Sequence, residues 1–411
     1  MNHRINKHIV VKNTFVASGF KVRMIIALQI FFWLAAFMLI HSYMLYPLIL
    51  EVLMFFKNKK QTHTETQLPG ISILMSVYNE EKIIAQKLDS ILQSNYPQQN
   101  IEIIIGSDCS TDNTENIITD YSKNHPQIKL QNFKERKGKP QILNELINLS
   151  SFDYVIFTDA NVLFDKDNIR NLAQSFSKDT GLVGSTIINH GLKEHGISRQ
   201  EGSYIKGENR IKYNEGFLWG TMMGPFGGCF MIRKNLFETI PPNFIVDDFY
   251  LSMIVLEKKY KCVCSSDALC YEDVSDEMSQ EFKRKKRISA GNYQNLKRFA
   301  SIAKKPFTNA GFCFLSHKVF RWWGPFAIII CGITLLALSF YLKFYLLLLA
   351  FYSLFLFMPL FDFVQKKMGI NNFIIRLSSY FVYMNIALLS GYIQYKKGIK
   401  TNVWNRTERV V

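Results

Sequence analysis

Residues 101–118 read IEIIIGSDCSTDNTENII, an apolar strand-forming run that ends at Ser107-Asp108 and continues into a helical pattern. The design recurs at residues 71–92, where an apolar run breaks at Tyr78-Asn79-Glu80, and again at residues 152–161 (FDYVIFTDAN). Strands that alternate with helices and are apolar on both faces predict a mostly parallel, doubly wound sheet of the α/β class.

Acidic side chains follow three of the predicted strands. Glu80, Asp108 and Asp159 each stand at the carboxyl end of a strand, which is where sheets of this kind bind their ligands. One such acid alone would more often be a cap or turn residue, but three at equivalent ends predict a binding site. Neither G-x-G-x-x-G after the first strand nor GK[ST] occurs, which argues against dehydrogenases and ATPases.

Hydrophobic residues make up 48% of the 411 residues and are unevenly placed. Residues 24–56 carry one charge (Glu51), 324–361 carry Lys343 alone, and 373–395 carry Arg376 alone. Each run is long enough for a helix of about 20 residues to cross a bilayer, and 324–361 is long enough for two. We therefore predict a soluble domain between membrane segments; the alternative is a large soluble protein with buried core helices.

Positive charge is concentrated before the second hydrophobic block. The net charge is +16, and residues 282–299 carry seven Lys or Arg and no acid. Such a cluster suits nucleic acid, a membrane surface or phosphates, but its position favours a cytosolic juxtamembrane segment. Without a nucleic-acid-binding motif, we do not expect nucleic acid as a partner. The seven cysteines are scattered, without metal-ligand spacing, as expected of reduced thiols in a cytosolic domain.

Six ordered segments carry a family resemblance: SVYNEE, IEIIIGSDCSTDNT, RKGKPQILN, TDAN, GPFGGCFMIRK and VDDFYLSM. In their order and spacing they resemble the inverting glycosyltransferases of family 2, over about residues 70–300. With its hydrophobic flanks, the chain is similar to the membrane-embedded branch of that family that makes bacterial polysaccharides. The resemblance implies a nucleotide-diphospho-sugar transferase (GT-A-like) fold: a doubly wound mixed sheet flanked by transmembrane helices.

The expected organisation has six parts. They are a basic extension (1–23), a transmembrane segment (24–56), a cytosolic glycosyltransferase domain (68–300), an interfacial helix (307–323), carboxyl-terminal transmembrane segments (324–395) and a basic tail (396–411). A single amino-terminal span would place the basic extension outside the cell, against the usual charge bias. The alternatives are that Met24 is nearer the true start, or that residues 24–56 form a hairpin bent at Pro47. Three carboxyl-terminal spans would likewise place the basic tail outside, so one stretch there is expected to lie in the interface.

The resemblance places Asp159-Ala160-Asn161 at the Asp-x-Asp motif, which contacts a divalent cation and the diphosphate. The expected cofactor is Mg²⁺ or Mn²⁺, which would neutralise the departing nucleotide diphosphate. Asn161 replaces the second Asp; an amide oxygen can still bind the cation, and the alternative is that Asn161 only shapes a turn.

The resemblance also assigns the nucleotide contacts. Asp108 is expected to hold the base or ribose, and Tyr78, Asn79 and Glu80 to surround the base. Lys139 is expected to be a loop cation near the nucleotide, where Gly138 would allow close backbone approach. The alternative is that Lys139 is a solvated loop residue.

The family pattern Thr-Glu-Asp followed by Leu-Ser places the catalytic base at Asp248. The spacing of Leu251, Ile254 and Val255 is helical, so Asp247 and Asp248 are expected at a helix amino terminus, which favours the ionised form of a base. We expect Asp248 to accept the proton and Asp247 to orient or cap.

Processive synthases carry Gln-x-x-Arg-Trp where this chain has Arg284, Arg287 and Ile288. The missing Trp, which would stack on the acceptor sugar, puts processivity in doubt. Arg284 and Arg287 are expected to contact the acceptor or a phosphate, or else to form a basic cytosolic face.

The expected function is inverting sugar transfer from a nucleotide-diphosphate sugar to a growing polysaccharide or lipid-linked glycan. The enzyme would be a multi-pass protein of the cell membrane, in contact with membrane lipids and with its catalytic domain in the cytosol. The alternatives are single-sugar transfer to a lipid carrier and a catalytically inactive membrane scaffold.

Overall fold

The structure is a computed structural model that describes residues 2–57, 68–190, 197–273, 277–370, 372–399, 401 and 403. The chain divides into two compact units, Met1–Leu45 with Phe320–Ile386, and Tyr46–Val319 with Ala387–Val411. The predicted basic tail lies mostly outside the described residues, and the side chains of the basic extension lie outside them up to residue 19.

The second unit contains one eight-stranded sheet in the order β3-β2-β1-β4-β7-β6-β8-β5. Its strands are β1 (Ile71–Val77), β2 (Ile101–Ser107), β3 (Ile128–Asn132), β4 (Tyr154–Thr158), β5 (Val162–Phe164), β6 (Thr180–His190), β7 (Cys229–Arg233) and β8 (Lys261–Asp273). The first four in this order are parallel neighbours, and β7 pairs antiparallel with both β4 and β6. The sheet is therefore mixed, as predicted.

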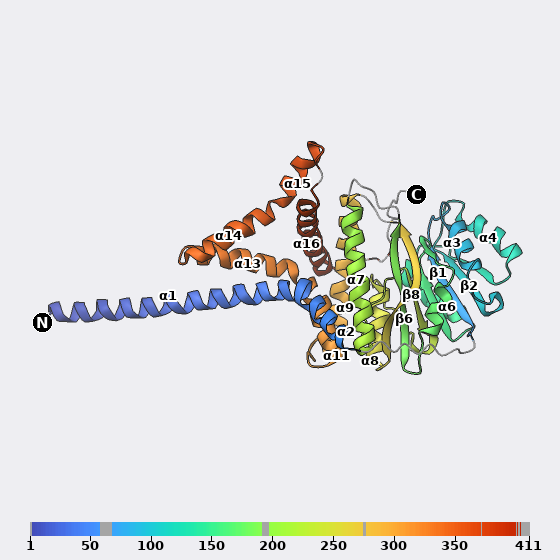
Figure 1. Cartoon of the computed structure of the whole chain (residues 1–411), viewed down its shortest axis with the longest axis horizontal. Coiled ribbons are helices and arrows are strands. Elements are labelled where there is room, and N and C mark those ends of the chain that lie inside the picture. Colours follow the sequence, from blue (N-terminus) through green and yellow to red (C-terminus); the bar gives the residue numbers. More distant parts are fainter. Residues whose placement is uncertain are drawn as a thin grey trace. The chain divides into compact units, whose positions relative to one another are not determined.

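Helices cover both faces of this sheet. Those that pack against its strands are α3 (Ile84–Leu92), α4 (Thr114–Asn124), α5 (Lys139–Leu149), α6 (Asn168–Gln174), α7 (Ser198–Trp219) and α8 (Asp247–Glu257). The same unit also contains α9 (Met278–Arg298), α10 (Ala300–Ala303), α11 (Asn309–Cys313), a π-helical segment η4 (Phe314–Val319) and short 3₁₀ turns η2 (Gln98–Asn100) and η3 (Lys234–Leu236). In Figure 1, α6 and α7 lie on opposite sides of β6 and β8. Every residue of β2 is buried, because an Ile-rich strand in mid-sheet can exclude water on both faces.

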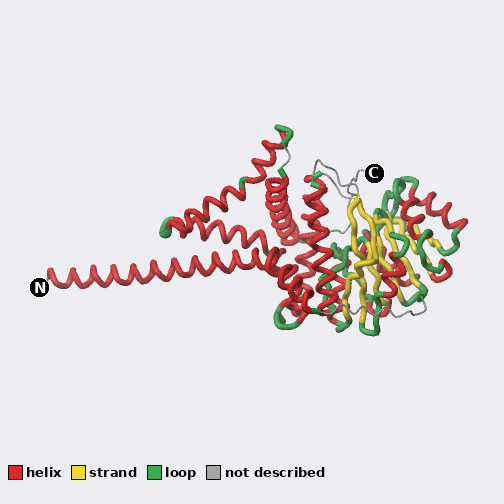
Figure 2. Tube along the Cα trace, viewed as in Figure 1, coloured by secondary structure: helices red, strands yellow, loops and turns green. Residues whose placement is uncertain are grey.

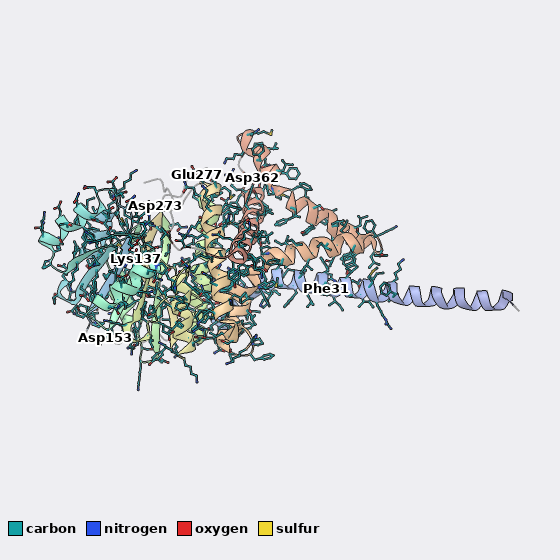
Figure 3. All side chains as sticks on the ribbon, turned by 180° about the vertical axis from the view of Figure 1, so that it is seen from behind. Phe31, Lys137, Asp153, Asp273, Glu277 and Asp362 are labelled. Atoms are coloured by element: carbon teal, nitrogen blue, oxygen red, sulfur yellow. The ribbon has the colours of Figure 1, made fainter. Side chains whose placement is uncertain are left out.

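The parallel strands end along one edge of the sheet. The register pairs Val77 with Ser107 and Met75 with Thr158, so the segments that follow β1, β2 and β4 emerge side by side. Figure 3 labels Asp153, just before β4, and Asp273, at the end of β8, on opposite edges of this unit. The carboxyl-terminal edge is the one predicted to carry the site.

The other unit is helical. It contains α1 (Asn2–Ile40), a π-helical segment η1 (His41–Leu45), α12 (Phe320–Trp322), α13 (Gly324–Ser339), α14 (Lys343–Leu356), α15 (Met358–Lys367) and the first part of α16 (Phe373–Lys397), while α2 (Tyr46–Phe56) belongs to the sheet-containing unit. Figure 2 shows these segments as helix joined by short loops. Phe32, Leu335 and Tyr345 form part of a buried apolar cluster between α1, α13 and α14, while Phe31, labelled in Figure 3, is 59% exposed.

Two helices of the described chain are long and apolar enough to cross a membrane, Phe20–Phe56 and Phe373–Lys397, or up to four if each of two bent helix pairs is one span. The first is continuous through Pro47, so the hairpin alternative is wrong. The π-helical turn at residues 41–45 directly precedes Pro47, as expected where a proline removes a helix hydrogen bond. Residues Asn309–Trp322 are helical and bent by 62° from the helix Gly324–Ser339. The interfacial position expected of residues 307–323 stays a prediction.

Candidate active site

The loop after β1 is fastened to the loop after β2. Asn79 has a left-handed backbone (φ 54°), which Asn tolerates better than most residues, and its Oδ1 accepts from the backbone N of Thr111 at 2.8 Å. The backbone N of Glu80 donates to Thr114 Oγ1 at 2.8 Å. The segment Tyr78-Asn79-Glu80 therefore lies beside the carboxyl end of β2, as predicted.

Asp108, at the end of β2, organises a neighbouring loop. Its Oδ1 accepts from the backbone N of Lys137 at 2.6 Å, and its Oδ2 accepts from the backbone N of Gly138 and from Arg136 Nε, both at 3.1 Å. Gly138 has φ 79°, a conformation that favours glycine. The Arg136 guanidinium lies 3.3 Å from the centroid of the Tyr78 ring. Both oxygens of Asp108 thus hold the loop, and its contact with a nucleotide stays a prediction.

Lys139 follows this loop as the first residue of α5. Its Nζ lies 2.7 Å from Asp159 Oδ1 and 3.7 Å from Asp247 Oδ2. Burial alone would lower the pKa of Lys139, but the carboxylates of Asp159 and Asp247 raise it above its ordinary value. Lys139 is therefore a cation between two acids rather than a solvated loop residue.

The Asp159-Ala160-Asn161 turn connects β4 to β5. The backbone N of Asp159 donates to Gly228 O at 3.2 Å, and Asn161 Nδ2 donates to Glu272 Oε1 at 3.3 Å. The antiparallel pairing of β5 with β8 sets Glu272 opposite Val162. The hydrogen bond to Glu272 occupies the amide nitrogen of Asn161. The amide oxygen is the atom of this side chain that could bind a cation.

These residues fit a divalent cation that is shared with a substrate. No group of three or more His, Cys, Asp or Glu suited to hold a metal occurs among the described residues. Mg²⁺ is usually bound through one or two carboxylates together with substrate phosphates and water. The half-exposed Asp159 carboxylate and the Asn161 amide oxygen supply such a partial set of ligands. Without the cation, Lys139 neutralises the charge of Asp159.

Asp247 and Asp248 begin α8, as predicted. Asp248 Oδ1 accepts from the backbone N of Phe249 at 2.7 Å, and Asp247 is 6% exposed, its Oδ2 lacking a hydrogen bond among the described residues. Burial, and then the neighbouring Asp247, raise the pKa of Asp248 to about 6, against the opposing effect of Lys139. A carboxylate with a pKa near the working pH suits general-base catalysis.

The GPFGG segment, residues 224–228, touches both sides of the site. A Cβ on Gly227 would lie 2.8 Å from Asp248 Oδ2, so a side chain here would force the Asp248 carboxylate to move. Gly228 O accepts from the backbone N of Asp159 and, at 2.8 Å, from Thr158 Oγ1. One short segment therefore sets the spacing between the Asp159 turn and Asp248.

Arg284 is committed to ion pairs on α9 and α7. It lies 3.4 Å from Glu281 and 3.7 Å from Glu201, and the same carboxylates pair with Lys285. Glu281 is the main reason that the pKa of Arg284 is raised. Arg287 lies one turn further along α9. The predicted acceptor or phosphate contacts of both arginines stay predictions, and a ligand would have to compete with Glu281 and Glu201 for Arg284.

Sequence reasoning missed Glu272 and a buried lysine, Lys87. Lys87 Nζ donates to Thr158 Oγ1 at 2.8 Å and to Val162 O, and burial lowers its pKa to about 8. It supports the Asp159 turn from the core side. Its spacing from Ile84, Leu88 and Ile91 on the apolar face of α3 was a usable signal.

Comparison with known proteins agrees with this geometry. Residues 72–240 match the model of Glycosyl transferase family 2, and residues 209–388 match that of Glycosyl transferase family group 2. The chain therefore contains glycosyltransferase family 2 domains. The predicted resemblance to family 2 glycosyltransferases is thereby confirmed.

Two relatives are named poly-beta-1,6-N-acetyl-D-glucosamine synthase. That of Staphylococcus epidermidis is 29% identical over 239 residues, 56% of this chain and 57% of the relative. That of Staphylococcus aureus is 26% identical over 258 residues, 61% of each. The chain thus matches less than two thirds of these relatives' length.

A solved mannosyltransferase of Pyrobaculum calidifontis, in complex with GDP-Man and Mn²⁺, has a similar structure. The TM-score is 0.65 at 18% identity, covering 90% of this chain and 99% of the other. At this identity the likeness concerns the fold, and it confirms the predicted GT-A-like class.

Proposed function

We propose that this family 2 glycosyltransferase transfers a sugar, with inversion, from a nucleotide-diphosphate sugar to a hydroxyl of a growing polysaccharide or lipid-linked glycan. The observation that carries this proposal is the Arg136–Lys139 segment. Its first three residues hold Asp108, and Lys139 contacts Asp159 and Asp247. One segment thus joins Asp108, Asp159 and Asp247, and Asp247 is the neighbour of the proposed base Asp248.

In the proposed reaction, Asp248 accepts the proton of the acceptor hydroxyl. The acceptor oxygen forms a bond to the anomeric carbon while the bond from that carbon to the phosphate oxygen breaks. The electron pair leaves with the nucleoside diphosphate from the opposite face, which inverts the configuration. Asp247 orients the base, and Lys139 supplies positive charge beside the leaving group.

A divalent cation, Mg²⁺ or Mn²⁺, would be held by Asp159 and the oxygen of Asn161. When bound, it would neutralise charge on the departing diphosphate. The Mn²⁺ in the mannosyltransferase complex supports this assignment. Asn161 keeps its amide nitrogen on Glu272, so only the oxygen is offered to the cation.

The donor to test first is UDP-N-acetylglucosamine, because both relatives are named for a polymer of N-acetylglucosamine. Tyr78 and Arg136 stack beside Asp108 and would surround the base. The absence of Trp at Ile288 favours the alternative of adding one or a few sugars to a lipid carrier.

The proposed location is the cell membrane, with the sheet-containing unit in the cytosol, where nucleotide sugars are made. Lys57 Nζ donates to Phe217 O and Leu218 O, which ties the end of the first span to this unit. Ser289 Oγ donates to Leu388 O, in the second half of α16, which ties that part of the helix to this unit as well. The chain between residues 319 and 388 would then cross the bilayer an even number of times. The basic tail would follow on the cytosolic side, as its charge favours.

The test is to incubate the full chain, purified into nanodiscs, with a panel of radiolabelled nucleotide sugars and lipid extract. The proposal predicts that one donor labels a glycan or lipid product and releases nucleoside diphosphate. Asp159→Ala should abolish both while membrane insertion is kept. Nucleotide binding without turnover, across the panel, would contradict the proposal and favour a scaffold.

A further inference from the structure

Lys212, in the middle of α7, is a buried cation outside the predicted site. It is 4% exposed, and its Nζ lies 3.4 Å from the centroid of the Phe226 ring. Burying an ammonium group is costly unless other groups compensate its charge. The groups around it therefore indicate what it does.

Among the described residues, four other titratable side chains act electrostatically on Lys212. They are Glu208 one turn earlier on α7, Lys318 on η4, Cys264 on β8 and Asp248 on α8. Burial, and then Lys318, lower the pKa of Lys212 to about 8, while Glu208 and Asp248 oppose this. Glu208 is itself held by Lys318 Nζ at 3.0 Å and His317 Nε2 at 3.1 Å. Lys212 therefore remains mainly charged at neutral pH.

Phe226 connects Lys212 to the site. It is the central residue of the GPFGG segment, and a cation over an aromatic face is an attractive contact that strengthens when water is excluded. The next residue, Gly227, packs against the Asp248 carboxylate, and Gly228 O accepts from Asp159 N. Lys212 thus holds the segment that spaces the base from the Asp159 turn.

We propose that Lys212 is a positioning residue for the transfer reaction: its ammonium seats Phe226 and keeps Asp248 ionised and aimed at the acceptor. The proposal rests on the function assigned to Asp248 above. In this role Lys212 acts through Phe226 and through its charge, rather than by binding donor or acceptor.

The sign of the effect follows from the groups that face Asp248. Asp247, on the same helix, disfavours the ionised form of Asp248, whereas Lys139 on α5 and Lys212 on α7 favour it. Removing Lys212 should therefore raise the pKa of the base. Lys212 has a smaller effect on Asp248 than Lys139 has, so its removal should raise the pKa by less than removal of Lys139 would.

The experiment compares pH profiles of kcat/KM for wild type, Lys212→Met and Lys212→Arg in nanodiscs. Met retains length and packs well on an aromatic ring, so Lys212→Met should fold. Its acidic limb should move to higher pH, with a loss of kcat/KM below the limb. Lys212→Arg should restore the limb. Lys206→Met, at an exposed position of the same helix, is the matched control and should match wild type.

A second measurement does not need turnover. The infrared carboxyl signal of Asp248, taken as the difference from Asp248→Asn, can be titrated in the wild-type and Lys212→Met backgrounds. The proposal predicts a higher midpoint in Lys212→Met. Equal midpoints would overturn it, as would coincident acidic limbs. Absence of sugar transfer by the wild type and by all the variants would count against the proposed function. The infrared titration would still decide whether Lys212 lowers the pKa of Asp248.

Discussion

The Nζ of Lys139 lies 2.7 Å from Oδ1 of Asp159, the acid at the end of β4. The same ammonium is 3.7 Å from Asp247, so one cation spans the turn that would hold the diphosphate and the helix that carries the base. Because Lys139 also begins α5, its position is set by the loop that Asp108 anchors.

Lys139→Met should lower kcat by about 10²-fold, the usual cost of removing one group that stabilises developing charge. It should also raise the affinity for Mn²⁺, because the ammonium no longer competes for Asp159. Turnover measurements test the effect on kcat. A Mn²⁺ titration, with nucleotide binding as the readout, tests the effect on metal affinity. Lys134→Met, at an exposed position before the same loop, is the control. An unchanged kcat in Lys139→Met would exclude Lys139 from the reaction.

Asn161→Asp should make stability depend on metal. The new carboxylate would face Glu272, whose Oε1 now accepts from Asn161 Nδ2 at 3.3 Å, so the two charges would repel without a cation. We expect the melting temperature to fall in EDTA and to rise with Mn²⁺ by more than in wild type. Equal responses of the two proteins to Mn²⁺ would favour Asn161 as a turn residue only.

The length of the product separates a polymer synthase from a single-sugar transferase. If Ile288 in place of Trp removes acceptor stacking, the radiolabelled product should carry one or a few sugars. Sizing the product on a gel decides between the two. A high-molecular-weight smear made by the purified chain would contradict the single-addition alternative.

The carboxyl-terminal edge of the sheet was predictable from sequence because local rules govern it. An apolar strand that is followed by Asp108 and then a helix is typical of a parallel α/β sheet. The carboxyl ends of parallel strands lie along the same edge of such a sheet. The Asp248 position came from the family resemblance. Its burial against Gly227 depends on how the GPFGG segment folds.

The remaining contacts depend on long-range pairing, which single-sequence patterns do not encode. Glu272 reaches Asn161 only because β8 pairs antiparallel with the three-residue strand β5. Similarly, Lys212 is a charged residue on a mostly polar helix, where burial was not expected. Its aromatic partner Phe226 and the like charge of Lys318 both come from other segments of the chain.

The central claim is that Asp248 is the general base, and Asp248→Asn tests it most directly. The change keeps size and hydrogen-bonding geometry but removes the proton acceptor, so kcat should fall by about 10²–10⁴-fold. Binding of the nucleotide sugar should stay near wild type. In wild type, kcat/KM should fall as the pH drops below about 6, because protonation of Asp248 removes the base.

Asp247→Asn is the internal control, since both residues lie in the first turn of α8 and a folding defect would affect both. Single-turnover transfer and nucleotide-sugar affinity, measured side by side for the two variants, give the decisive comparison. The account predicts near-complete loss of transfer in Asp248→Asn with affinity kept, and a smaller loss in Asp247→Asn. Full transfer by Asp248→Asn, or loss in Asp247→Asn alone, would contradict it.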